Sequence, residues 1–253
     1  MLRRALLLTA LAAPAAVPAI AQTRPIPATA RQLVVVTTPS WTAVQGTLRR
    51  YVRAEARTPW TAVGAPVPVN VGNAGLGWGR GLHGALAPAG QRGPLKAEGD
   101  GRAPAGVFRL TSAFGYAPAV RTGLPYLPVD ADVECVDEGD HALYNRIVHR
   151  DSTRGDYRSH EEMRRPDDLY RVGVVVAHNG IDGALGAAAP RGGSCIFLHQ
   201  WRGAGQPTVG CTAMAATPLD ALVSWLDAAR APVLVQLPAS MYRRLRTAWQ
   251  LPR

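Results

Sequence analysis

The sequence has few cysteines, few aromatic residues and no long apolar run beyond its N-terminal region. Three cysteines and 6% aromatic residues are spread over 253 residues. Because no later segment has eighteen consecutive apolar residues, the sequence predicts no membrane span in the mature protein. It also has no Lys/Arg cluster interleaved with aromatic residues, which argues against nucleic acid as a partner.

The N-terminus has the pattern of an exported protein. A basic start, an apolar stretch from Ala5 to Ala13 and the Ala19-Ile20-Ala21 site are typical of a cleavable secretory signal. A membrane-tethering helix is the alternative, but Pro14 and Pro18 break it where a span would continue. We therefore interpret residues 1–21 as a signal peptide and predict a location in the periplasm or cell envelope.

The chain carries an excess of positive charge. Its formal net charge is +10, and loss of Arg3 and Arg4 with the signal peptide leaves +8, since 10 minus 2 is 8. Positive charge draws a protein toward anionic polymers, and the anionic cell envelope suits an exported protein. Arginine-rich usage by a GC-rich genome explains the same composition.

The three cysteines are Cys135, Cys195 and Cys211. An exported compartment favours disulfides, and an odd count leaves one thiol unpaired. The simplest arrangement is therefore one disulfide and one free, reactive thiol. Cys195 is a candidate partner of Cys135, with Cys211 as the free thiol; alternatively, Cys195 is a second active-site thiol.

The organisation along the chain indicates one mainly β domain with a few peripheral helices. Residues 22–31 are rich in Pro and Ala and predict a flexible leader, residues 32–240 the main domain and residues 241–253 a helical tail. Thr217-Pro218 predicts the start of a helix that runs to about Ala229. Short β-branched runs predict strands at 33–38, 47–54, 107–111, 172–177, 196–199 and 233–237, and a short helix is predicted over 159–164.

Two residues near the C-terminal half of the domain suit acyl-transfer chemistry. An apolar run ends on His199, and Cys211 follows after Gly210. A thiol needs a base to form the reactive thiolate, and histidine titrates in the appropriate range. The backbone N–H groups of Gly210 and Cys211 are candidates for an oxyanion hole. A core histidine with a buried, inert cysteine is the alternative.

Three segments resemble the YkuD-type L,D-transpeptidase catalytic domain. They are Ile196-Phe197-Leu198-His199, the stretch Thr208-Val209-Gly210-Cys211-Thr212-Ala213-Met214, and residues 98–108, which are similar to the family's GDGxTPxGxF hairpin. The motif is divergent, because Val209 stands where the common family motif has a histidine. The resemblance implies a YkuD-like β-sandwich with a catalytic groove.

The same resemblance implies a function. His199 would be the proton donor and acceptor and Cys211 the nucleophile of a peptidoglycan L,D-transpeptidase, with no cofactor and no metal. Its partners would be peptidoglycan stem peptides, as acyl donor and as acceptor. Water in place of the acceptor amine would give an L,D-carboxypeptidase, and the crosslink type, 3,3 or 1,3, stays open.

Further residues are candidates for substrate binding. Arg146 could hold a stem carboxylate, since arginine forks onto carboxylates; a solvent-facing arginine is the alternative. Trp201 could form a wall of the groove or pack in the interior. His178 could border the groove or serve as a hydrogen-bonded structural histidine.

Two other function classes compete with this hypothesis. A metal-dependent envelope peptidase would need His178, His199 and a cysteine to converge with tetrahedral spacing. No short His-x-x-His or Cys-x-x-Cys pair supports it. The second is a non-catalytic wall-binding module, which predicts that Cys211→Ala leaves every cell-wall phenotype intact.

Overall fold

Strands dominate the computed structural model, which describes residues 24–153 and 155–253, so the prediction of a mainly β protein is confirmed. The predicted signal peptide lies outside the described residues. The strands are β1 (Gln32–Thr38), β2 (Gln45–Val52), β3 (Thr61–Asn70), β4 (Leu76–Trp78), β5 (Ala103–Gly115), β6 (Tyr126–Pro128), β7 (Val133–Val136), β8 (Arg146–His149), β9 (His160–Glu162), β10 (Val172–Val176), β11 (Phe197–Gln200), β12 (Thr212–Met214) and β13 (Val233–Pro238). The helices are α1 (Ala216–Trp225) and α2 (Ala239–Trp249).

The main sheet closes on itself, which corrects the expectation of a sandwich. Its order is β10-β11-β12-β3-β2-β1-β13-β5, and β5 also pairs with β10, so eight strands form a closed barrel. Closure depends on the length of β5, which has 13 residues. Its Gly106–Arg109 part pairs with β13, and its Leu110–Gly115 part pairs with β10. The strand β5 thus pairs with both ends of the strand order, β13 and β10, and closes the sheet, whereas a sandwich would have two separate sheets.

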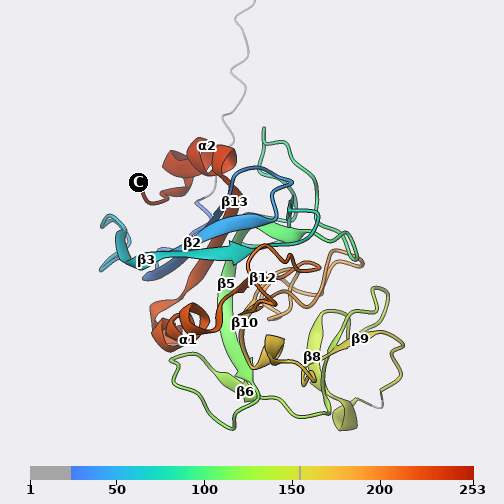
Figure 1. The fold of residues 1–253 in the computed structure, drawn as a ribbon. Helices are drawn as coiled ribbons and strands as arrows, with labels where there is room; N and C mark the ends of the chain where they lie inside the picture. The colour runs from blue at the N-terminus through green and yellow to red at the C-terminus, as the bar shows by residue number, and fades with distance from the viewer. Residues whose placement is uncertain (1–23, 154) are drawn as a thin grey trace, which may run out of the picture.

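The two helices lie on opposite sides of the barrel (Figure 1) and cover it with apolar side chains. Leu219, Leu222 and Val223 of α1 are buried at helical spacing, and α2 buries Leu245 and Trp249 in the same way. The predicted helix start at Thr217 differs slightly from the structure, since α1 begins at Ala216 and no side chain caps it. No helix of the described residues is long and apolar enough to cross a membrane.

The segment 24–31 differs from the expected flexible leader. Ile26 and Ala30 are buried in the barrel's core, with 7% and 0% of their surface exposed. The buried Arg53 holds this segment, because its guanidinium donates to the carbonyls of Pro27 and Ala30, both at 2.8 Å. The Pro- and Ala-rich composition predicted a flexible segment, but these hydrogen bonds give two of its backbone carbonyls a partner and attach the segment to the barrel.

A second sheet of three strands, ordered β8-β7-β9, lies beside the barrel; we call it the side sheet (Figure 1). It contains β9 where the sequence predicted a helix over 159–164, because these residues pair with β7. A disulfide between Cys135 of β7 and Cys195, two residues before β11, joins the side sheet to the barrel. Their Cα atoms are 6.0 Å apart.

Loss of this disulfide should destabilise the protein. It closes a loop with a sequence separation of 60 residues. In the chain-entropy model, such a crosslink stabilises the fold by about 4 kcal/mol. We expect the double variant Cys135→Ala/Cys195→Ala to lose stability on that scale in urea unfolding, and Cys211→Ala, which removes no crosslink, to lose much less. Equal losses would contradict the assignment.

Candidate active site

The Cys211 thiol is buried and held by the backbone that leads into β11. Sγ accepts from the N–H of Phe197 at 3.3 Å and donates to the carbonyl of Cys195 at 3.4 Å. Only 5% of Cys211 is exposed, and it is the free cysteine of the described residues. Because it directly precedes β12, which runs parallel to β11, the strand pairing sets where the sulfur lies.

His199 lies on β11, opposite Ala213 of β12, and is held in one tautomer. Nδ1 lies 2.7 Å from the carbonyl of Gln200, which can only accept, so Nδ1 carries the proton and Nε2 is the free base. The ring of Tyr170 packs edge-on against the imidazole, with 5.2 Å between centroids. Burial lowers the pKa of His199 to about 4, so it is neutral at pH 7.

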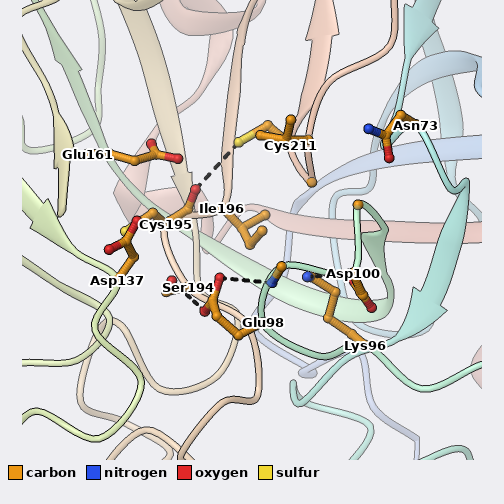
Figure 2. Close-up of a pocket in the computed structure, with 14 residues that line it drawn as sticks. Asn73, Lys96, Glu98, Asp100, Asp137, Glu161, Ser194, Cys195, Ile196 and Cys211 are labelled. Atoms are coloured by element: carbon orange, nitrogen blue, oxygen red, sulfur yellow. Dashed lines mark hydrogen bonds and ion pairs between the residues drawn. The ribbon is translucent and has the colours of Figure 1, made fainter. Parts of the chain in front are cut away.

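Two cavities meet at Cys211. The larger, of about 420 Å³, is lined by the 96–101 turn and the 194–196 segment, and Figure 2 shows Cys211 at one side of it. The smaller, of about 150 Å³, contains both His199 and Cys211. Glu161, Val209 and Cys211 line both. No hydrogen bond joins His199 to Cys211 in the described part of the chain, although they share the smaller cavity.

The environment of Cys211 keeps the thiol protonated at rest. Burial and the negative charge of Glu161 raise its pKa to about 12. The N–H of Phe197 opposes this shift, because it stabilises the thiolate. Any reaction of this sulfur as a nucleophile would therefore need a proton acceptor, and neutral His199 is the candidate base that lines the smaller cavity.

The loop before Cys211 is fixed by Thr208. Its hydroxyl donates to the carbonyl of Cys211 at 2.7 Å and accepts from the N–H of Gly210 at 3.1 Å. The predicted oxyanion donor on Gly210 is therefore engaged locally, and the N–H of Cys211 is the remaining candidate. Val209 is 75% exposed at the rim of both cavities, so it meets the solvent and any ligand that enters.

The 98–108 hairpin contributes a wall of the larger cavity, and Asp100 shapes its turn. This carboxylate accepts from the backbone N–H groups of Ala97 and Arg102 at 2.8 and 2.9 Å and from Lys96 Nζ at 2.7 Å. Gly101 has a φ of +66°, and a Cβ there would lie 2.0 Å from Oδ1 of Asn73. The positive φ favours glycine here, and a larger residue would also displace the Asn73 side chain.

The other predicted residues separate into one at the site and two away from it. Trp201 lines the smaller cavity beside His199. Arg146 instead donates to the carbonyl of Ile181 at 2.9 Å and lines a different cavity. His178 lines neither cavity at Cys211; its Nε2 bonds the carbonyl of Gly192 at 3.0 Å. The set of His178, His199 and a cysteine that the competing metal-dependent peptidase would need is not brought together among the described residues.

Sequence reasoning missed three residues that face the thiol. Glu161 and Asp137 line the larger cavity, and Tyr170 lines the smaller one. The misassigned helix over 159–164 hid Glu161, and Asp137, two residues after Cys135, was given no role. Its place beside a disulfide cysteine was the available signal, since a crosslink fixes its neighbours.

The chain matches no family model, no curated protein and no solved structure in the three comparisons. Among the described residues, Asp130, Asp132 and His149 bring potential metal-ligand atoms within 4.8 Å of one another. None of these three lines either cavity at Cys211. The Cys211 thiol is therefore surrounded by two adjoining cavities, one of which also contains the neutral imidazole of His199.

Acid should destabilise this fold below neutral pH. Burial lowers the pKa of His83, His178 and His199 from 6.5 to about 4, 3 and 4. Between pH 6.5 and 4, these histidines bind protons in the unfolded chain but not in the folded protein, so the free energy of unfolding decreases as the pH is lowered. Glu161, whose pKa is raised from 4.5 to about 7, contributes in the opposite direction. We expect a falling thermal midpoint over this window, with a steeper fall in Glu161→Gln; a midpoint independent of pH would contradict it.

Proposed function

We propose that this protein is a peptidoglycan L,D-transpeptidase that transfers the acyl group of a stem peptide through Cys211. The observation that carries the proposal is the position of this free thiol at the junction of two cavities, with neutral His199 in one of them. Two cavities on either side of a nucleophile suit a reaction with an acyl donor and a separate acceptor.

The proposed first half-reaction forms a thioester. Nε2 of His199 takes the thiol proton as Sγ attacks the carbonyl between the L- and D-centres of a tetrapeptide stem. The N–H of Cys211 stabilises the oxyanion, and collapse of the intermediate breaks the C–N bond. His199 then gives its proton to the leaving D-alanine amine, so one imidazole serves first as base and then as acid.

The sequence resemblance supplies the substrate class. The 98–108 hairpin, His199 and Cys211 carry the likeness to YkuD-type domains, and all three contribute to the cavities at the thiol. We propose that the closed barrel is this chain's form of the YkuD-like sheet arrangement, with the groove formed by the two cavities. The positive net charge and the export signal support an anionic cell-envelope substrate and a periplasmic or envelope location.

An L,D-carboxypeptidase acting on the same stems is the second candidate. The larger cavity is open to solvent at Val209, which is 75% exposed, and water entering there could resolve the thioester. The two activities share the first half-reaction and differ only in the group that attacks the thioester.

Activity should depend on the two reacting side chains. We expect Cys211→Ala to abolish release of D-alanine from purified tetrapeptide muropeptides, and His199→Gln to lower its rate by about 10²- to 10⁴-fold. Product analysis by mass spectrometry distinguishes crosslinked dimers from shortened stems. Retention of D-alanine release by Cys211→Ala would overturn the proposal.

A covalent probe gives an independent check of the nucleophile. Intact-mass spectrometry after incubation with a carbapenem should show one adduct that maps to Cys211 and is absent from Cys211→Ala. The unchanged thermal midpoint of that variant would show that the fold is intact. Cell-wall binding that persists without any D-alanine release in the wild-type protein would instead favour a wall-binding module.

A further inference from the structure

Glu161 is the acidic residue that lines both cavities at Cys211. It lies on β9 of the side sheet, directly opposite Cys135 in the pairing with β7. Cys135 is bonded to Cys195, and the carbonyl of Cys195 accepts from the Cys211 thiol at 3.4 Å. The carboxylate and the sulfur are therefore placed relative to each other by a covalent crosslink and one hydrogen bond, and they face the same space in Figure 2.

The hydrogen bonds of Glu161 leave one carboxylate oxygen for a ligand. The hydroxyl of Tyr170 donates to Oε2 at 2.7 Å. Within the described residues, no hydrogen bond from a protein group reaches the other oxygen, Oε1. Tyr170 in turn packs on His199, so the carboxylate is oriented by the same ring that contacts the catalytic base.

The wall around Glu161 favours a cation. Glu98 and Asp137 line the same cavity, and Oδ1 of Asp137 is buried without a hydrogen-bond partner. Glu98 accepts from the neutral hydroxyls of Tyr144 and Ser194. The cation of that cavity, Lys96, is already paired with Asp100 at 2.7 Å.

We infer that the larger cavity binds an acceptor that carries a primary ammonium group, and that Glu161 removes a proton from this group. The inference rests on the proposed function, because it concerns the second half-reaction of the same thiol. It assigns the acceptor to the side-sheet face of Cys211 and the acyl donor to the smaller cavity with His199.

The step balances as follows. An ammonium R–NH₃⁺ gives one proton to the Glu161 carboxylate and becomes the amine R–NH₂. Its nitrogen attacks the thioester carbonyl, a C–N bond forms, the C–S bond breaks and the sulfur leaves as a thiolate. The second nitrogen proton passes to this thiolate through His199, and Glu161 releases its proton to solvent. Protonated amines do not attack carbonyls, which is why the acceptor needs a base.

The surroundings of Glu161 suit that base. Burial raises its pKa to about 7; the hydrogen bond from Tyr170 opposes the shift, Asp137 and Glu98 add to it, and Arg165 opposes it. A base that titrates near the working pH exchanges protons in both directions most effectively. The raised pKa of Glu161 therefore distinguishes it from an ordinary surface glutamate.

A competition between two acceptors tests the inference in the full-length mature protein. The acyl-enzyme, loaded with a tetrapeptide donor, is offered an N-acetylated tetrapeptide with one lysine ammonium together with hydroxylamine, which is unprotonated at neutral pH. We expect Glu161→Gln to lower the ratio of peptide product to hydroxamate by about tenfold or more. Both acceptors draw on one thioester, so the ratio is independent of the acylation rate.

Glu162→Gln is the matched control, since Glu162 is the next residue on β9, is exposed and lines neither cavity. It should leave the ratio unchanged. An unchanged ratio in Glu161→Gln, with active wild-type protein, would overturn the inference alone. A wild-type protein that forms hydroxamate and hydrolysed stem but no peptide product would also overturn it, in favour of the carboxypeptidase. Absence of any acyl-enzyme in the wild type would overturn the proposed function itself.

Discussion

The Cys135–Cys195 disulfide is the constraint on which the site depends. One of its ends belongs to the side sheet, and the other belongs to the segment whose carbonyl accepts from the Cys211 thiol. The polar contacts of Asn145 reinforce the junction, since its side chain accepts from the N–H of Cys195 and donates to the carbonyl of His178 at 3.0 Å each. Other contacts also join the side sheet to the barrel, such as the hydrogen bond from Tyr170 to Glu161, but the disulfide is the covalent link that reaches the backbone beside the thiol.

The barrel supplies the second constraint, the parallel placement of β11 and β12. This parallel pairing places His199, on β11, close to the start of β12, which Cys211 directly precedes, although the two residues are twelve positions apart. Thr208 lies in the loop between these two residues, and its hydroxyl donates to the carbonyl of Cys211 and accepts from the N–H of Gly210. The positions of His199 and Cys211 are therefore set by strand pairing and by the hydrogen bonds of Thr208, with no hydrogen bond between the two described side chains.

The sequence predicted the parts of this molecule that depend on local pattern. The β-branched runs at 33–38, 172–177 and 233–237 became central strands, because continuous apolar runs suit strands that are buried on both faces. Barrel closure could not be read in this way, since it depends on two partners of the long strand β5. The site shows the same division. Cys211 and His199 could be picked out by residue type. Glu161 could not, because its position at the site depends on strand pairing with Cys135, which is in turn bonded to Cys195.

Lys96 gives the molecule a property that matters for any enzyme that carries an activated acyl group. It is the single lysine of the chain, its side chain is 3% exposed, and its ammonium is bound by Asp100 and by the carbonyl of Ala97. The described surface therefore presents no free side-chain amine. Under the proposed function, a thioester formed on one molecule would therefore meet no exposed lysine on the described surface of a neighbouring copy, which limits acylation of one copy by another.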